Sequence, residues 1–364
     1  MKLLIAGGGT GGHVFPALAI AQEWLSRGAE REVVLVGTQR GIEMKLVPEA
    51  GLPLETIRVA GLKGKGGTTL MKNLAMLGSG LTDAFGVLKR HRPTVAFGVG
   101  GYAAGPMMLA TWLRGIPNVI FEPNAEPGLT NKLLARLAKR IATGYEISSA
   151  AWGEKAVVTG CPVRAEFFTI AAQAPGKPFR LLVTGGSQGA LPINRTFVEA
   201  AALLAKRKNE LRIVHQTGER DYNNVRAAYT RYEIQAEVQP FLTNMAERFA
   251  WADAIVCRSG AITAAEVAAA GRAAIFIPFG RATDSHQLRN AQEMNNAGAG
   301  RLIPESELTA ERLTREIFSL LAQPREIEAI ARKARSLARP EAAREIVNLI
   351  EEAARPKWEA VPAN

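Results

Sequence analysis

The sequence contains few cysteines and no long uninterrupted apolar run. Its two cysteines, Cys161 and Cys257, are too few for a disulfide framework and indicate a reducing compartment. The N-terminus reaches glycine at residue 7, which leaves too little room for the apolar core of a signal peptide. No stretch approaches the roughly 18 apolar residues of a membrane-spanning helix. We therefore expect a cytoplasmic protein whose membrane contact is peripheral.

Aromatic residues are also scarce, at 6% of the chain, and they are not interleaved with basic residues. This argues against a nucleic-acid partner. The net charge is nevertheless +11, which leaves phosphorylated substrates and an anionic membrane surface as partners. Residues 1–162 carry 18 basic and 11 acidic side chains, an excess of +7, and the remaining +4 lies in residues 163–364.

The two halves of the chain begin alike. Residues 2–6 and 180–184 each predict a short buried strand, followed by the glycine-rich loops 7–12 and 185–190 and then by a helical run. A strand, a glycine turn and a helix open a doubly wound α/β domain. Further strands that alternate with helical stretches are predicted at 33–36, 95–98, 119–121, 140–143, 211–215, 255–257 and 274–277. The fold class is therefore α/β, with two Rossmann-like domains built on parallel sheets.

The length of 364 residues predicts two domains, at about 100–200 residues for each. An apolar strand and a turn precede a segment, residues 171–178, that is typical of an exposed linker. We therefore expect an N-terminal Rossmann-like domain at 1–164 and a C-terminal one at 165–340. The helix-forming tail, residues 341–364, is long enough to pack back on the first domain.

The two glycine-rich loops lack the partners that known nucleotide loops need. Gly7, Gly9 and Gly12 have the spacing of the dinucleotide fingerprint, but no acidic residue ends the second predicted strand of either half to bind a ribose. Neither loop contains the Gly-Lys-Ser/Thr of a Walker A motif. An NAD(P)-dependent dehydrogenase is therefore disfavoured. What remains is a turn at a helix N-terminus, which either binds phosphate or is a tight turn without a ligand.

Three further clusters follow predicted strands, at the edge where open α/β sheets bind ligands. They are the glycine-rich turn 98–106, the polar run 121–124 and the helix start 257–266. Within the last, Glu266 either accepts hydrogen bonds from a ribose diol or faces solvent. His13 either caps its turn or transfers a proton at the mouth of a cleft. The histidines and cysteines show no metal-ligand spacing.

A basic and apolar segment lies in the N-terminal half. Residues 70–77 place apolar side chains at helical spacing, and Lys63, Lys65 and Lys72 lie close by in the sequence. This pattern is typical of a helix that lies on an anionic bilayer. It is also typical of an amphipathic helix that packs on a sheet with its charges outward.

Taken together and in this order, the motifs resemble those of the MurG family, bacterial N-acetylglucosaminyltransferases of peptidoglycan synthesis. The resemblance extends to about residue 350 and is carried by residues 8–16, 100–106, 185–190, 257–266 and 284–291. It implies a GT-B fold, in which two Rossmann-like domains face a deep cleft. It also implies transfer of GlcNAc from UDP-GlcNAc to the C4 hydroxyl of MurNAc in lipid I, undecaprenyl-pyrophosphoryl-MurNAc-pentapeptide. The product would be lipid II, with inversion to a β-1,4 link.

The resemblance assigns the donor site mostly to the C-terminal domain. There Arg164 and Ser187 would hold the diphosphate, Leu242 would lie by the uracil and Glu266 would bind the ribose. The full set that it assigns to UDP-GlcNAc is Thr10, Gly11, Gly12, Asn124, Arg164, Ser187, Leu242, Ala261, Ile262, Thr263, Ala264, Ala265, Glu266 and Gln287. The set that it assigns to the acceptor is Gly100, Gly101 and Tyr102.

The chemistry that the resemblance implies needs no cofactor. A helix N-terminus and Arg164 can stabilise the charge of the departing UDP without a metal, although stimulation by a divalent cation stays open. Inversion needs a base for the acceptor hydroxyl. His13 and Glu122 are the two candidates, and the sequence does not choose between them.

The sequence departs from the family pattern at a few positions near these motifs. Phe121 and Pro123 stand where many relatives have histidine and glutamine, while Glu122 is kept. Ala104 replaces a frequent serine, and His286 replaces a frequent glutamine. None of these changes removes a group that the reaction requires.

The expected partners are UDP-GlcNAc, lipid I and an anionic membrane surface, with cell-wall synthesis proteins also compatible. The expected location is the cytoplasmic face of the inner membrane, as a peripheral protein. The nearest alternative function is another UDP-sugar enzyme of the same fold, either a UDP-GlcNAc 2-epimerase or a glycolipid glycosyltransferase. A non-catalytic nucleotide-binding module is a second alternative, disfavoured because candidate catalytic and binding groups occur together.

Overall fold

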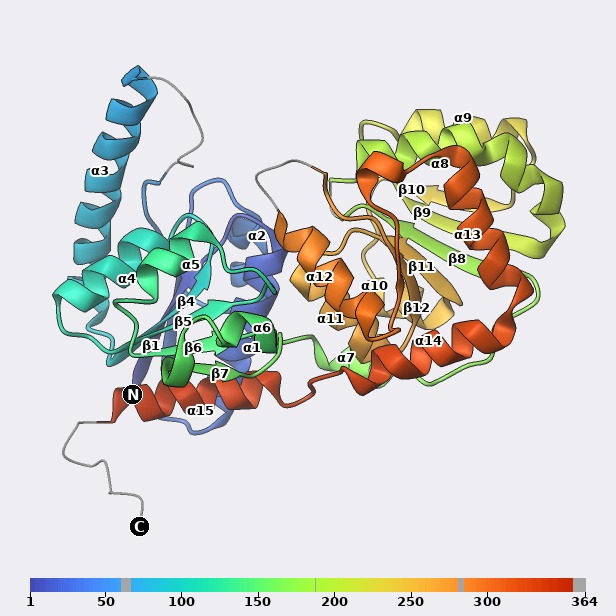
Figure 1. Cartoon of the computed structure of the whole chain (residues 1–364). Coiled ribbons are helices and arrows are strands. Elements are labelled where there is room, and N and C mark those ends of the chain that lie inside the picture. The colour runs from blue at the N-terminus through green and yellow to red at the C-terminus, as the bar shows by residue number, and fades with distance from the viewer. Residues whose placement is uncertain (60–66, 187, 281–284, 356–364) are drawn as a thin grey trace, which may run out of the picture. The chain divides into compact units, whose positions relative to one another are not determined.

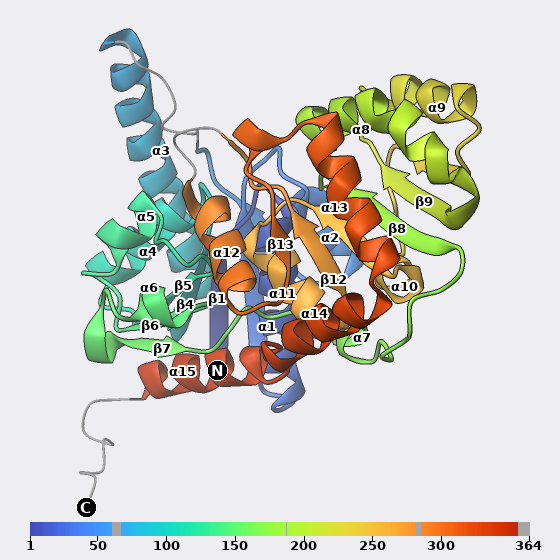
Figure 2. The same cartoon turned by 45° about the vertical axis from the view of Figure 1, so that its right-hand side comes forward.

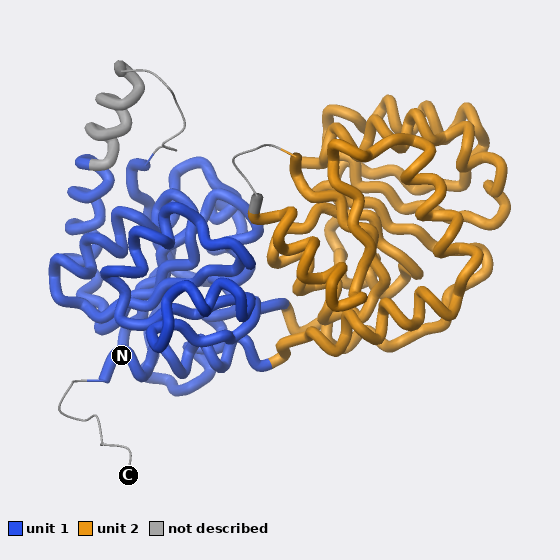
Figure 3. Tube along the Cα trace, viewed as in Figure 1, with its two compact units in different colours: residues 1–163, 341–364 blue, residues 164–340 orange. Residues whose placement is uncertain are grey.

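The structure, a computed structural model, describes residues 1–59, 67–186, 188–280 and 285–355, and the side chains of residues 67–77 and 285 are not part of that description. It divides into two compact units (Figure 3). Unit 1 comprises Met1–Val163 and Glu341–Asn364, and unit 2 comprises Arg164–Pro340. Each unit is described below by itself.

Unit 1 is built on a parallel sheet in the strand order β3-β2-β1-β4-β5-β6-β7. The central strand β1 pairs with β2 on one side and with β4 on the other, with Leu4 opposite Val34 and Ala96. Its inner residues, 3–6, are apolar and buried, as expected of a parallel strand that is covered on both faces. The strands are β1 (Lys2–Gly7), β2 (Glu32–Gly37), β3 (Leu54–Thr56), β4 (Val95–Gly100), β5 (Asn118–Glu122), β6 (Arg140–Thr143) and β7 (Ala156–Val158).

The helices of unit 1 include one from the C-terminal end of the chain. They are α1 (Gly11–Ser26), α2 (Glu43–Glu49), α3 (Gly67–His91), α4 (Ala104–Leu113), α5 (Leu129–Leu134), α6 (Glu146–Ser149) and α15 (Ala342–Ala354). Helix α15 packs against α1 and against strands β4 to β6 (Figures 1 and 2). Glu351 on α15 forms ion pairs with Arg27 at 2.9 Å and with Arg31 at 2.8 Å. The C-terminal helix is therefore part of unit 1.

Unit 2 repeats the plan with the strand order β10-β9-β8-β11-β12-β13, again all parallel. Its strands are β8 (Phe179–Thr184), β9 (Leu211–Gln216), β10 (Ala236–Gln239), β11 (Ala254–Cys257), β12 (Ala273–Phe276) and β13 (Arg301–Leu302). Its helices are α7 (Ala165–Phe168), α8 (Leu191–Leu204), α9 (Tyr222–Arg231), α10 (Met245–Trp251), α11 (Ala261–Ala270), α12 (Ser285–Asn296), α13 (Ala310–Ala322) and α14 (Pro324–Ser336).

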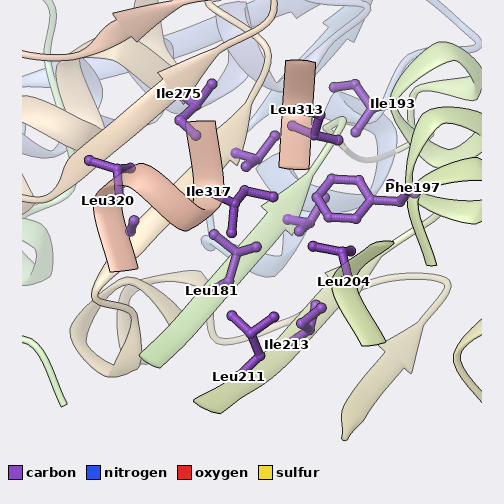
Figure 4. Packing of buried hydrophobic residues seen from close by; sticks show 14 of the residues in the cluster. Leu181, Ile193, Phe197, Leu204, Leu211, Ile213, Ile275, Leu313, Ile317 and Leu320 are labelled. Carbon is purple, nitrogen blue, oxygen red and sulfur yellow. The ribbon is translucent and has the colours of Figure 1, made fainter. Parts of the chain in front are cut away.

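The core of unit 2 lies between its sheet and the helices α8 and α13, which pack against each other. Leu181 and Ile213 from the sheet, Phe197 from α8 and Ile317 from α13 are all buried there (Figure 4). Truncating one such leucine or isoleucine to alanine costs about 2–5 kcal/mol, because the cavity that it leaves fills only partly. This packing fixes the sheet whose carboxyl edge carries the candidate site.

Two parallel α/β units confirm the predicted fold class, and the strands predicted from apolar runs all occur. Helix α1 begins at Gly11, within the predicted loop of residues 7–12, because the Thr10 carbonyl already accepts hydrogen bonds from the N–H groups of His13 and Val14. In each unit the first strand lies between the second and the fourth, β1 between β2 and β4 and β8 between β9 and β11, so the strand order reverses there. Open α/β sheets bind ligands at the carboxyl edge beside this point.

Candidate active site

Three neighbouring strands of unit 1 end at the same edge of the sheet in residues predicted to be functional. Strand β1 ends at Gly7, β4 at Gly100 and β5 at Glu122. The loop after β1 touches the loop after β4, because a Cβ added at Gly101 would overlap the carbonyl of Gly8. Gly101 has φ +80°, a conformation that glycine adopts without strain. The two glycine-rich loops therefore form one surface.

His13 lies on this surface in the first turn of α1. Its Nδ1 is 3.2 Å from Oγ1 of Thr10, and a Cβ built on Gly100 would lie 3.1 Å from its Nε2. Burial lowers the pKa of His13, and this outweighs the opposite effects of the Glu43 charge and of a hydrogen bond with the backbone of Gly8. The imidazole is therefore neutral at pH 7 and able to accept a proton.

Glu122, the other candidate base, is buried at the end of β5, and its two carboxylate oxygens accept four hydrogen bonds. Oε1 accepts from the backbone N–H and the side-chain amide of Asn124 at 3.0 and 2.9 Å. Oε2 accepts from the N–H of Gly128 and from Nδ2 of Asn131, both at 2.9 Å. This carboxylate therefore orders the loop that carries Asn124.

The remaining candidates of unit 1 lie at the solvent side of the same edge. Thr10 and Gly12 are exposed, and Gly11 is half-buried. Tyr102, which follows the second glycine turn, is 50% exposed. These residues are open to a ligand that approaches the edge.

In unit 2, Gln216 connects the glycine-rich loop to Leu242. It is buried at the end of β9, where its Nε2 donates to the carbonyl of Gly186 at 2.7 Å and its Oε1 accepts from the N–H of Leu242 at 3.3 Å. A Cβ on Gly189 would overlap the carbonyl of Thr217, so this loop too is packed closely against its neighbour. Leu242 therefore lies beside the loop that follows β8. Ser187, within that loop, is outside the described residues.

Helix α11 presents its N-terminus and Glu266 at the end of β11. Its first residues, Ala261 and Ile262, are buried, as is Ala264, while Thr263 and Ala265 are half-buried. The first N–H groups of a helix have no partner within the helix and attract anions. This end of α11 therefore has the character of a phosphate site.

Arg164 and Glu266 lie next to each other, although they are far apart in the sequence. Nη2 of Arg164 is 3.4 Å from Oε1 of Glu266, and its Nη1 is 3.1 Å from Glu166. Burial raises the pKa of Glu266 to about 7, and the Arg164 charge opposes this effect. A carboxyl group with a pKa of about 7, next to an arginine and a helix N-terminus, suits the binding of a ribose and its phosphate.

Gln287 on α12 is tied to strands β11 and β12. Its Oε1 accepts from the N–H of Phe279 at 3.1 Å, and its carbonyl accepts from Oγ of Ser259 at 2.8 Å. Arg258, which is almost fully buried, donates to the carbonyls of Ile277 and Pro278 and so joins the ends of the same two strands. The loops that carry the candidate donor residues are thereby held in place.

Three residues that the sequence analysis did not assign support these sites. Gln216 and Arg258 fix loops in unit 2, and Glu43 fixes the first glycine loop of unit 1. A sequence signal exists for Glu43, which follows β2 in a turn with glycines at 37 and 41. The basic segment around Lys63, Lys65 and Lys72 lies outside the residues or side chains described. Within the described part of the chain, no cluster of three or more histidine, cysteine or acidic side chains is arranged to hold a metal ion.

Comparisons with known proteins agree over nearly the whole chain. The Glycosyltransferase family 28 N-terminal domain matches residues 3–143, and the Glycosyltransferase family 28 C-terminal domain matches residues 180–347. A protein of Myxococcus xanthus named UDP-N-acetylglucosamine--N-acetylmuramyl-(pentapeptide) pyrophosphoryl-undecaprenol N-acetylglucosamine transferase is 45% identical, over 96% of this chain and 92% of its own length.

Solved structures agree in fold. The crystal structure of Acinetobacter baumannii MurG has a TM-score of 0.78 and 32% identity, and the match covers 96% of this chain and 99% of that one. A UDP-GlcNAc 2-epimerase from Neisseria meningitidis, at 15% identity and a TM-score of 0.69 over 97% of this chain and 100% of that one, shares the fold alone. The two units are therefore the Rossmann-like halves of a GT-B fold. The chain belongs to glycosyltransferase family 28, and within it to the MurG transferases.

Proposed function

We propose that the protein transfers GlcNAc from UDP-GlcNAc to the C4 hydroxyl of MurNAc in lipid I and so produces lipid II. The observation that carries this function is 45% identity over 96% of the chain to a transferase whose name states that donor and that acceptor. The epimerase shares only the fold, so its likeness supports no activity. Inverting transfer breaks the bond between the anomeric carbon and UDP, while the C4 oxygen forms the new bond from the opposite face.

The donor, in this proposal, binds at the carboxyl edge of unit 2. The ribose hydroxyls bind Glu266, the uracil lies by Leu242 and the GlcNAc contacts Gln287. The diphosphate lies at the N-terminus of α11 near Arg164, with Ser187 as a further contact. As UDP departs, its terminal phosphate gains negative charge, which the helix N-terminus and the guanidinium stabilise. This arrangement requires no cofactor.

The base, in this proposal, is His13. Its pKa is lowered, so that the imidazole is ready to accept a proton at neutral pH. Glu122 already accepts four hydrogen bonds, and removing a proton from the acceptor would require it to give up one of them. Its role is to order the loop so that Asn124 reaches the donor sugar. Thr10, Gly11 and Gly12 reach the sugar from the same edge, and Gly100, Gly101 and Tyr102 contact the acceptor.

The membrane contact, in this proposal, includes a surface of unit 1 formed by the adjacent helices α4 and α5, called here the α4–α5 surface. Four large apolar side chains of these two helices are exposed, namely Trp112, Leu113, Leu129 and Leu133. Three exposed basic residues accompany them, namely Arg114, Lys132 and Arg136. Apolar and basic groups together favour an anionic bilayer. In the described part of the chain, no helix combines the length and apolar character needed to span a bilayer.

This surface supports a peripheral location on the cytoplasmic face of the inner membrane, where the lipid-linked acceptor is reached and where cell-wall synthesis proteins are potential partners. The larger basic excess of residues 1–162 also favours unit 1 as the part of the protein that contacts an anionic membrane.

The function is tested with radiolabelled UDP-GlcNAc and a lipid I analogue. We expect the label to move into the lipid fraction only when both the enzyme and the acceptor are present. Hydrolysis or epimerisation of UDP-GlcNAc without transfer would contradict the proposal and would favour another UDP-sugar enzyme.

A further inference from the structure

A buried carboxylate is hydrogen-bonded to the glycine loop that precedes His13. Glu43, the first residue of α2, is 1% exposed. It accepts hydrogen bonds from the N–H of Gly9 at 2.7 Å and from both the N–H and the hydroxyl of Thr38 at 2.8 Å. These bonds connect the loop after β1 to the loop after β2. Hydrogen bonds to an ionised acceptor are stronger than neutral ones, so the connection is firm.

The surrounding backbone leaves room for this side chain and for little else. A Cβ on Gly8, Gly37 or Gly41 would overlap the side chain of Glu43. Glycines after β1, at the end of β2 and in the loop after β2 therefore form the space that the carboxylate fills. Glycine at each of these three positions is therefore required for the Glu43 side chain to fit.

The position of this carboxylate changes what the first glycine loop can do. In a phosphate-binding loop, backbone N–H groups point to the anion of the ligand. Here the N–H of Gly9 already points to an internal anion. Since a second anion would be repelled there, the loop is suited to present a side chain rather than to hold a phosphate at Gly9.

The charge of Glu43 also acts on His13. Among the described residues, Glu43 is the charged group whose field raises the pKa of this imidazole, against the effect of burial. Three uncharged groups also lie beside the ring, namely the hydroxyl of Thr10 and the backbone of Gly8 and of Gly100. A fixed negative charge close to an imidazole stabilises its protonated form.

We propose that Glu43 is a positioning residue for the transfer reaction, which holds the loop of residues 7–12 in place and stabilises the imidazolium that forms on His13. This inference rests on the proposed function. The proton moves from the C4 hydroxyl of the acceptor to His13, the C4 oxygen bonds to the anomeric carbon, and UDP leaves with the electron pair of the broken bond. Glu43 touches none of the reacting atoms and stays ionised throughout.

The test compares Glu43→Gln with Glu49→Gln. Both substitutions remove one carboxylate from α2, but the side chain of Glu49 is 56% exposed and its ion partner is Lys45 at 3.9 Å. We expect Glu43→Gln to lower kcat about 10–100-fold with KM for UDP-GlcNAc within twofold, and Glu49→Gln to leave both unchanged. A kcat for Glu43→Gln within twofold of the wild type overturns the proposal.

The pH profile separates the charge effect from a general loss of structure. Because Glu43 raises the pKa of His13, its removal lowers that pKa and keeps the base unprotonated to lower pH. The acid limb of kcat therefore moves to lower pH in Glu43→Gln and stays in place in Glu49→Gln. A limb that does not move, or that moves to higher pH, overturns the electrostatic half of the proposal.

Hydrogen exchange tests the loop without reference to activity. The amide proton of Gly9 loses protection in Glu43→Gln and keeps it in Glu49→Gln, and unchanged protection overturns the positioning half. Thr38→Val removes only the hydroxyl that donates to Glu43, so it provides a milder variant if Glu43→Gln does not fold. For Thr38→Val we expect a two- to fivefold lower kcat, and wild-type kcat would contradict the proposal.

His13→Asn distinguishes this inference from the proposed function. Normal turnover in His13→Asn means that His13 is not the base, and the electrostatic half of the inference then fails with it. Exchange of the Gly9 amide still decides whether Glu43 holds the loop.

Discussion

The glycine-rich loops of the two units occupy the same place in the same fold, yet they are anchored by opposite means. In unit 1 a carboxylate, that of Glu43, accepts a hydrogen bond from the N–H of Gly9. In unit 2 a neutral amide, Gln216, donates to the carbonyl of Gly186. The first anchor adds negative charge behind the loop and consumes an N–H, while the second adds no charge. A shared strand–glycine–helix unit is thus suited to presenting a base in one half and to binding a diphosphate in the other.

The two units also differ in the pKa of a buried glutamate, Glu43 in unit 1 and Glu266 in unit 2. Hydrogen bonds from Gly9 and Thr38 lower the pKa of Glu43 even though burial opposes this, so Glu43 stays ionised. Burial raises the pKa of Glu266 to about 7, because Arg164 compensates only in part. Glu43, whose carboxylate already accepts several hydrogen bonds from the protein, stabilises the structure. Glu266, which has fewer such donors, is available to bind a ligand.

The largest expected effect tests the unit 1 side of this comparison. His13→Ala removes the proposed base, and we expect kcat to fall about 10²–10⁴-fold, the range typical of general base catalysis. KM for UDP-GlcNAc stays within threefold, because the donor binds mainly to unit 2. The measurement is steady-state transfer of label to a lipid I analogue. Retention of more than a tenth of the wild-type kcat would remove His13 from this role.

The next effect tests the unit 2 side. Glu266→Ala removes the acceptor of the ribose hydroxyls, and hydrogen bonds to charged groups contribute roughly 1.5–3 kcal/mol. We expect the Kd for UDP, measured by calorimetry, to rise about 10–100-fold. Glu166→Ala, which removes the more exposed partner of Arg164, serves as the matched control and changes Kd by less than threefold. Equal losses in both variants would mean that Arg164, not Glu266, carries the effect.

The pKa of Glu266 also predicts a pH dependence of stability. Because its folded-state pKa of about 7 lies above the ordinary value of 4.5, the folded state binds the proton more tightly. This contribution to stability is fully present below pH 4.5 and is lost as pH rises toward 7. Glu266→Gln removes it, so the difference in Tm between the variant and the wild type should grow in the variant's favour from pH 5 to pH 8. A constant difference would show that Glu266 has an ordinary pKa.

A smaller effect is expected from converting one anchor into the other. Gln216→Glu keeps the acceptor for Leu242 but replaces the donor to Gly186 with a negative charge. We expect UDP to bind about tenfold more weakly, since the loop would then oppose an anion as the first loop does. Gln216→Ala removes the anchor without adding charge and should weaken binding less. If the two variants bind UDP equally, charge behind the loop is not what separates the two units.

The smallest effect concerns the membrane. Leu129→Ser and Leu133→Ser on the α4–α5 surface should together lower binding to anionic vesicles several-fold, with Kd for UDP unchanged. Raising the salt concentration should release the wild type by screening its basic residues. Vesicle binding that is insensitive to both changes would exclude this surface as the contact.

The fold followed from the sequence because its central strands are buried on both faces and appear as apolar runs. Strands β3, β10 and β13 were not predicted, because they have only three, four and two residues and form no apolar run. The candidate loops were found for the same reason, since polar residues after a buried strand mark the carboxyl edge of the sheet. The roles of individual residues within these loops could not be predicted, because they depend on contacts with residues far away in the sequence. Nothing local in the sequence shows that the donors from 124 to 131 saturate Glu122, or that Arg164 meets Glu266 across more than a hundred residues.

The most direct test of the division between the two units is the single-turnover rate of GlcNAc transfer at saturating UDP-GlcNAc. We expect saturating donor to restore Glu266→Ala to within a few-fold of the wild-type rate. We expect His13→Ala to stay at least about 100-fold slower under the same conditions, because saturation cannot replace a base. Recovery of His13→Ala to the wild-type rate at saturating donor would show that the two units do not divide base and donor binding in this way.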